Sequence, residues 1–169
     1  YKLTMLDGEG VVVGNKACAL QALLAAGLSL DEELCRDALN NVSLTGRHQT
    51  LIYDGVTVLL DVAHNPAAAA LLASRLCRTN VSYFAVASVL SDKDWSGIVD
   101  SLSPVIARWY VAEINTSERA ADAQQLVQVL YNKQLRASWY DSISAAFLTA
   151  IKDAGDGGRV VVLGSFHTV

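Results

Sequence analysis

Short runs of apolar, β-branched residues alternate with longer segments of helical periodicity from position 49 to the end of the chain. The short runs predict strands at residues 49–53, 56–61, 82–88, 105–112, 136–139 and 159–163. The longer segments predict helices at residues 66–78, 93–102, 122–133 and 142–154. Strands that are apolar on both faces and separated by helices are typical of a sheet covered on both sides. The pattern therefore predicts an α/β fold with a mostly parallel sheet and helices on both faces.

Local signals mark the ends of several of these elements. Asp54-Gly55 predicts a tight hairpin turn, so the first strand should be antiparallel to the second. Asn65 is a good N-cap, and Pro66 suits the first position of a helix because its φ is preset. Asp122 and Asp141 are the predicted caps of the last two helices.

The first 44 residues have a different pattern, a short β-like start followed by two helical segments. Asn15 is the predicted cap of a helix over residues 16–26. Ser29 to Glu32 has the form of a capping box for a second helix, which should end near Asn40. Two helices and a ribbon are too small to bury a core of their own, so we expect this region to pack on another domain.

Residues 45–48 are the predicted linker between the two regions, because Gly46 frees the backbone there. The predicted domains are accordingly residues 1–44 and residues 49–169.

Composition narrows the class of protein. The net charge is −4 and the pI is about 5.2, with no basic stripe, which argues against binding to nucleic acid. No apolar run approaches the ~20 residues of a membrane span, and no signal-peptide pattern opens the chain. Cys18, Cys35 and Cys77 are widely spaced, which favours reduced thiols and a cytoplasmic location. Tyr1 in place of methionine points to a fragment.

The candidate chemistry begins where the second predicted strand ends. Asp61 and His64 lie on the short loop between that strand and the next helix, and ligands bind at such loops in open α/β sheets. Asp61 either caps the backbone of its own turn or binds a ligand hydroxyl or a metal. His64 is either a polar surface residue or a ligand contact beside a helix N-terminus, which attracts anions.

Three further segments carry candidate residues. Arg47 is either a surface ion-pair partner or a planar fork for phosphate or carboxylate. Ser91 to Asp94 follows a predicted strand, and its charges are typical of a solvated helix start. Gly164 to His167 follows the last strand and should line the same rim as His64.

Several familiar motifs are missing from the sequence. There is no GxxxxGK[ST] phosphate loop, no GxGxxG after a strand, no GxSxG elbow and no HExxH. If a nucleotide binds to this chain, its phosphates should therefore be held elsewhere.

Four segments together carry a family resemblance: Gly46-Arg47-His48-Gln49, the run from Asp61 to Pro66, Asp92-Lys93-Asp94, and the run from Gly164 to Val169. They resemble the C-terminal part of bacterial folylpolyglutamate synthases, the bifunctional dihydrofolate synthase/folylpolyglutamate synthases in particular, which are members of the Mur ligase superfamily. The resemblance extends over the whole chain.

The resemblance implies a Rossmann-like C-terminal glutamate ligase domain of the Mur ligase type. It also implies a central ATPase domain, which carries the P-loop and the Mg²⁺ ligands and of which residues 1–44 would be the last part. In this family ATP phosphorylates a carboxylate of dihydropteroate or tetrahydrofolate, and the amine of L-glutamate attacks the acyl phosphate. The cofactors implied are ATP and Mg²⁺, and the fragment alone should be inactive.

The resemblance also assigns roles to five residues of this chain. Asn15 matches an asparagine that contacts adenine, and Arg47 matches an interdomain arginine that reaches ATP phosphate. Asp61 matches an aspartate that binds the nucleotide, through its ribose. His64 and Ser165 match residues near the incoming glutamate.

Two positions depart from the family pattern. Thr45 replaces a usual proline before Gly46, which bears on the stiffness of the hinge. Ala67 replaces a frequent histidine after Pro66, which bears on one substrate contact. Two other functions stay open at this point: another Mur ligase that acts on a peptidoglycan precursor, or a non-catalytic nucleotide-binding module.

Overall fold

The computed structural model describes residues 13–42, 44–79 and 81–169. They divide into two compact units, residues 1–49 and residues 50–169. The predicted β-like start of the chain lies outside the described residues.

The first unit contains helices α1 and α2. Helix α1 spans Val13–Ala25 and ends before Gly27, whose φ is 80°. The prediction that Asn15 caps α1 is wrong, because the helix already includes the two residues before it. A cap needs an extended backbone, and Asn15 is helical. The Nζ of Lys16 donates a 2.7 Å hydrogen bond to the carbonyl oxygen of Leu39, which ties α1 to α2.

Helix α2 spans Glu32–Asn41. The predicted capping box is wrong in register, because Asp31 rather than Ser29 is the N-cap. The Asp31 carboxylate accepts a 2.8 Å hydrogen bond from the backbone N–H of Leu34. An aspartate with an extended backbone immediately before the first helical turn accepts a hydrogen bond from a free backbone N–H. Its negative charge also interacts favourably with the positive end of the helix dipole.

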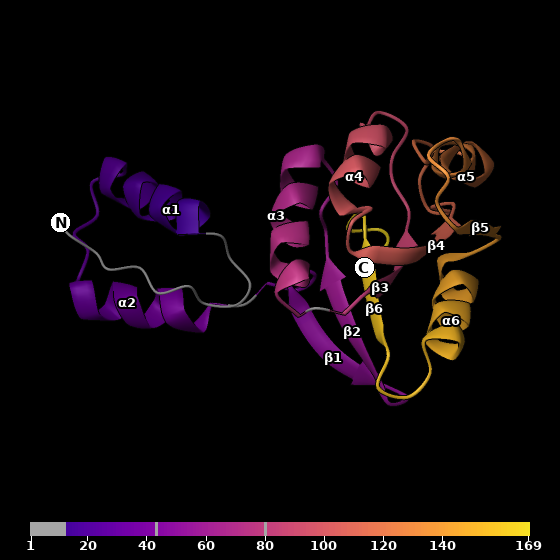
Figure 1. The fold of residues 1–169 in the computed structure, drawn as a ribbon. Coiled ribbons are helices and arrows are strands. Elements are labelled where there is room, and N and C mark those ends of the chain that lie inside the picture. The colour runs from indigo at the N-terminus through magenta and orange to yellow at the C-terminus, as the bar shows by residue number, and fades with distance from the viewer. Residues whose placement is uncertain (1–12, 43, 80) are drawn as a thin grey trace. The chain divides into compact units, whose positions relative to one another are not determined.

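The second unit is built on a six-stranded sheet in the order β1-β2-β6-β3-β4-β5 (Figure 1). The strands are β1 (Gln49–Tyr53), β2 (Val56–Asp61), β3 (Tyr83–Ala87), β4 (Ile106–Ala112), β5 (Ala137–Tyr140) and β6 (Arg159–Leu163). The pairs from β2 to β5 are parallel. Asp54 and Gly55 have φ values of 48° and 76°, as a two-residue hairpin turn requires, so β1 is antiparallel to β2. The predicted mostly parallel sheet is confirmed.

The order of the strands explains which face each helix covers. The helices are α3 (Pro66–Leu76, followed by the 3₁₀ turn η1, Cys77–Thr79), α4 (Trp95–Leu102), α5 (Ala123–Asn132) and α6 (Ile143–Ala154). The chain moves outward from β2 to β5, so right-handed crossovers place α3, α4 and α5 on one face. It then returns to β6 in the middle of the sheet, and this places α6 on the other face.

The caps of these helices mostly follow the sequence signals. Asn65 and Asp122 are the N-caps of α3 and α5, as predicted. The cap of α6 is Ser142, whose Oγ accepts a hydrogen bond from the backbone N–H of Ala145, so the prediction of Asp141 is wrong by one residue. Both residue types are good caps, and only Ser142 directly precedes the first helical turn.

Two apolar layers form the core, one on each face of the sheet. Trp109 and Tyr110 are neighbours on β4, point to opposite faces and are both fully buried. Trp109 lies in the layer under α3, α4 and α5, whereas Tyr110 lies in the layer under α6. Among the described residues, no helix has the length and apolar character needed to cross a membrane.

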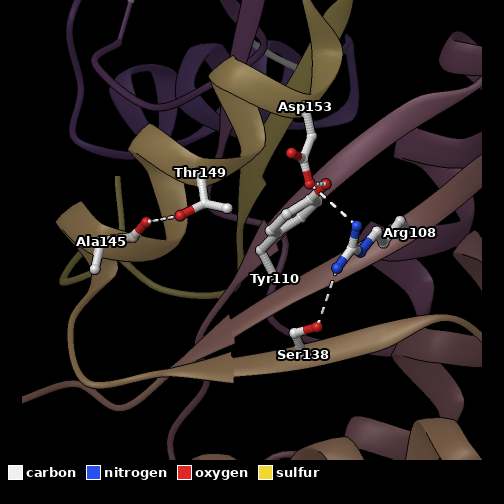
Figure 2. A network of polar contacts seen from close by, with 6 residues as sticks. All are labelled: Arg108, Tyr110, Ser138, Ala145, Thr149 and Asp153. Atoms are coloured by element: carbon white, nitrogen blue, oxygen red, sulfur yellow. Dashed lines mark hydrogen bonds and ion pairs between the residues drawn. The ribbon is translucent and has the colours of Figure 1, made fainter.

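A polar network fastens α6 to the sheet (Figure 2). The hydroxyl of Tyr110 donates a 2.8 Å hydrogen bond to the Asp153 carboxylate on α6. Arg108 forms a 3.1 Å ion pair with the same carboxylate and donates to the Oγ of Ser138 on β5. The network therefore joins β4, β5 and α6 through hydrogen bonds.

Candidate functional site

A cleft of about 250 Å³ lies where the loops that follow β2, β3, β4 and β6 meet. The residues that line it are His64, Leu90, Lys93, Arg119, Gly164, Ser165, Phe166 and His167. Strand β6 enters the sheet between β2 and β3, so the loops on its two sides diverge at the carboxyl ends of the strands. Ligands of open α/β sheets bind at such a place. The volume suits a ligand of about amino-acid size, since pockets for larger ligands measure about 300–1,000 Å³.

His64 is positioned by the short connection between β2 and α3. Val62 and Ala63 are fully buried, and Asn65 caps the helix, so the loop is held at both ends. The Nδ1 atom of His64 lies 2.8 Å from the carbonyl oxygen of Val62. A carbonyl oxygen can only accept, so Nδ1 carries the proton and the neutral ring keeps a lone pair on Nε2. Half-buried His64 can therefore accept a proton or a hydrogen bond in the cleft.

The segment after β6 forms one wall of the cleft and is tied to β3. Gly164 has a φ of 119°, and a Cβ there would collide with the carbonyl oxygen of Ser88, so only glycine fits. The Oγ1 of Thr168 donates a 3.1 Å hydrogen bond to that same carbonyl oxygen. The Oγ of Ser165 accepts from the backbone N–H of His167, at 3.2 Å. Ser165 and Thr168 are both buried, so this wall has a defined shape.

Two cations at the cleft share one carboxylate. The Nζ of Lys93 and the Nη2 of Arg119 each lie 2.8 Å from an oxygen of Asp92. The hydrogen bond from Lys93 lowers the pKa of Asp92, and Arg119 adds to this effect, so Asp92 stays ionised at neutral pH. Asp94 has a different task, because it caps α4 through the backbone N–H of Gly97. The predicted solvated helix start thus describes Asp94, whereas Lys93 lines the cleft.

Arg119 belongs to none of the candidate segments that the sequence indicates. It reaches the cleft because residues 119–121 pair with residues 89–91 through an antiparallel bridge between Leu90 and Ala120. The backbone N–H of Ser91 donates a 2.8 Å hydrogen bond to the carbonyl oxygen of Arg119. One signal was available, since Arg119 lies on the loop after a predicted strand, as His64 does.

The structure brings together two of the five residues to which the sequence assigned roles, namely His64 and Ser165. Asp61 ends β2 beside the end of β6 and is half-buried, but it does not line the cleft. Asn15 and Arg47 belong to the first unit, so their roles toward ATP stay predictions, as does that of Asp61.

Residues that could bind a metal ion do not gather in the described part of the chain. Within residues 13–42, 44–79 and 81–169, no group of three or more His, Cys, Asp or Glu side chains could hold an ion. The three cysteines are free thiols. Asp92 and Asp94, on the loop that contributes Lys93 to the cleft, are engaged in the ion pairs and the cap described above.

Comparisons with known proteins agree with this architecture. The family model for the Mur ligase glutamate ligase domain matches residues 46–166. The dihydrofolate synthase/folylpolyglutamate synthase of Escherichia coli K12 is 39% identical over 157 residues, which are 92% of this chain and 36% of that protein. This chain therefore spans little more than a third of the length of that relative.

Two solved structures are similar over nearly the whole chain. E. coli FolC in complex with DHPP and ADP has a TM-score of 0.83 and 37% identity, and the match covers 98% of this chain and 39% of that one. A bifunctional folylpolyglutamate synthase/dihydrofolate synthase with Mn, AMPPNP and L-glutamate bound has a TM-score of 0.83 and 38% identity, covering 99% of this chain and 40% of that one. The chain thus belongs to the Mur ligase family, as a member that contains its glutamate ligase domain.

Proposed function

We propose that this chain is the C-terminal part of an ATP-dependent amide ligase. The substrates we propose are L-glutamate and an acceptor carboxylate on dihydropteroate, tetrahydrofolate or both. The observation that carries the proposal is the cleft, where His64, Lys93, Arg119 and Ser165 converge at the carboxyl ends of the strands of a glutamate ligase domain. The names of the relatives and the ligands in the similar structures support this choice of substrates.

The cleft suits L-glutamate because its charges are complementary to those of the amino acid. L-Glutamate has two carboxylates and one ammonium group. Lys93 and Arg119 supply positive charge for the carboxylates, and the N-terminus of α3 beside His64 also favours an anion. The hydroxyl of Ser165 lies on the opposing wall and can donate a hydrogen bond.

The reaction we propose forms an amide. ATP, when bound, supplies the phosphoryl group that makes the acceptor carboxylate an acyl phosphate. The glutamate nitrogen then attacks the acyl carbon, the bond from that carbon to the phosphate oxygen breaks, and inorganic phosphate leaves. The ammonium nitrogen must lose one proton before it attacks and a second as the amide forms. We propose that Nε2 of His64 accepts the first, because Nδ1 is hydrogen-bonded to the carbonyl oxygen of Val62, and that the departing phosphate takes up the second.

The contacts to ATP are proposed for residues outside the cleft. Asn15 would contact adenine, Asp61 the ribose and Arg47 the phosphates, where a guanidinium stabilises charge in phosphoryl transfer. The described residues hold no metal cluster, so we expect Mg²⁺ ligands and the P-loop on a preceding ATPase domain, the main partner of this chain.

The test is an assay of the full-length enzyme with ATP, L-glutamate and one acceptor at a time. We expect amide formation with dihydropteroate, tetrahydrofolate or both, and none with the purified 169-residue chain alone. Ligation only to a peptidoglycan precursor, or no ligation at all, would contradict the proposal.

Single substitutions in the same enzyme separate the two sides of the reaction. His64→Ala should raise the KM for L-glutamate much more than the KM for ATP. Arg47→Ala should lower kcat by roughly 10³-fold, because it removes charge stabilisation from phosphoryl transfer. An effect of His64→Ala on ATP alone would move His64 to the nucleotide side.

A further inference from the structure

The unusual feature of the cleft is that its two cations depend on a single carboxylate. Lys93 and Arg119 both pair with Asp92, each at 2.8 Å. Neither has another ion-pair partner among the residues that the structure describes. The group of three therefore has one net positive charge, which faces the cleft where an anion can neutralise it.

The two cations differ in how readily they can leave Asp92. The side chain of Lys93 is 28% exposed and follows Asp92 directly in the chain, whereas that of Arg119 is 64% exposed and comes from another loop. An ion pair this exposed contributes little to stability, because water solvates both partners well. If Arg119 leaves, Asp92 keeps its hydrogen bond from Lys93. Arg119 is therefore the cation that a ligand can recruit at small cost.

The backbone of Arg119 does not move as freely as its side chain. Residues 119–121 are held by the bridge between Leu90 and Ala120, and the Arg119 carbonyl accepts from Ser91. The guanidinium can thus exchange partners while its Cα stays beside the cleft. A planar guanidinium binds a carboxylate through two parallel hydrogen bonds, a geometry that an ammonium group cannot match.

We propose that Arg119 leaves Asp92 to bind the side-chain carboxylate of the incoming L-glutamate, and that this exchange makes the cleft select a dicarboxylic amino acid over its amide. The inference rests on the proposed function, which places L-glutamate in this cleft. L-Glutamine has nearly the same shape, but its amide presents an NH₂ group that cannot accept a hydrogen bond from the second arm of the guanidinium. When L-glutamine is bound, one N–H donor of the Arg119 guanidinium therefore lacks an acceptor, and this lowers the affinity for L-glutamine relative to L-glutamate.

The test is an NMR titration of the 169-residue chain with L-glutamate and, separately, with L-glutamine. For the unchanged chain we expect tighter binding of L-glutamate. Arg119→Gln should weaken L-glutamate binding by about tenfold or more and leave L-glutamine nearly unaffected. Arg119→Lys keeps the charge but not the fork, so it should restore only part of the preference. Arg136→Gln is the matched control, since Arg136 is exposed on the same unit and does not line the cleft.

The outcomes distinguish a failure of the inference alone from a failure of the proposed function. If the unchanged chain binds L-glutamate and Arg119→Gln binds it equally well, the inference is wrong while the proposed function stands. A parallel loss for both amino acids would assign Arg119 to the shape of the loop, and the thermal unfolding midpoint of the variant would report that damage. If the unchanged chain binds neither amino acid, the placement of L-glutamate in the cleft is wrong and the inference fails with it.

Discussion

Two arginine–aspartate ion pairs of the second unit invite comparison, one inside a network under α6 and one at the mouth of the cleft. The pair of Arg108 and Asp153 measures 3.1 Å, and that of Arg119 and Asp92 measures 2.8 Å. In the first pair, Asp153 also accepts from the buried hydroxyl of Tyr110 (Figure 2). In the second pair, the other partner of Asp92 is Lys93, a second cation.

The two ion pairs differ in how many contacts would be lost if each of them opened. The guanidinium of Arg108 lies 5.1 Å from the centre of the Tyr110 ring and also donates to Ser138, so three elements would lose contacts. Opening the pair of Arg119 frees one exposed cation and leaves Asp92 with Lys93. The nitrogen–oxygen distance alone therefore does not show what an ion pair contributes to the structure. The first holds the fold, and we propose that the second is exchanged for substrate.

The network should dominate stability, and Tyr110→Phe tests this most strongly. The substitution keeps the ring and removes the hydroxyl that donates to Asp153. We expect the free energy of unfolding to fall by about 1–3 kcal/mol, because a hydrogen bond from a fully buried hydroxyl to a charged acceptor is lost. Urea denaturation measures the change, and Tyr131→Phe is the control, because it removes an exposed hydroxyl that donates to a backbone carbonyl oxygen, that of Ala137, rather than to a carboxylate. If both variants lost the same free energy of unfolding, the hydroxyl of Tyr110 would contribute no more to stability than that of Tyr131.

Alkaline pH should weaken the same network. Burial and then the hydrogen bond to Asp153 raise the pKa of Tyr110 well above its ordinary value of 10.0. Its contribution to stability is therefore complete below about pH 10, where the unfolded chain still binds the proton, and is lost as the pH rises above that value. We expect the stability difference between the unchanged chain and Tyr110→Phe to narrow between pH 9 and pH 11. A constant difference over that range would contradict this explanation.

The elements of the second unit could be predicted because their signals are local. Asp54-Gly55 has the positive φ values of a tight hairpin, and Asn65-Pro66 begins α3 where expected. The errors occur where two neighbouring residues are both good caps, as with Asp141 and Ser142. Which of them caps the helix depends on where β5 ends and the first helical turn begins. Asn15 shows the same limit, since a favourable residue type caps a helix only when its backbone is extended.

The cleft could be predicted only in part, for a different reason. His64 and Ser165 follow their strands directly, so the rule for carboxyl ends of strands finds them. Arg119 depends on a bridge between segments that are remote in the sequence, which hydropathy patterns do not reveal. The sharing of Asp92 by two cations arises from that same bridge. The roles of Asn15, Arg47 and Asp61 toward ATP stay predictions.

Thr168→Val tests whether the wall of the cleft matters for binding rather than for stability. The valine keeps the shape but cannot donate to the Ser88 carbonyl oxygen, which also lies against Gly164. We expect a modest loss of about 0.5–1.5 kcal/mol in stability and a few-fold weaker binding of L-glutamate. Thr168→Ser keeps the donor and should bind like the unchanged chain. If valine and serine behave alike in the titration, the hydroxyl does not position the wall.

The smallest effect should come from Asp92→Asn, and its sign is the informative part. Asparagine has almost the shape of aspartate but no charge, so it holds Arg119 and Lys93 less strongly. If Asp92 competes with the substrate for Arg119, its removal should tighten L-glutamate binding by about threefold, since exposed ion pairs are weak. The equivalent change in the network, Asp153→Asn, should leave binding unchanged and lower stability, because Tyr110 and Arg108 lose a charged acceptor. Weaker binding in Asp92→Asn would mean that Asp92 holds Arg119 in its binding position, and the two ion pairs would then both be structural.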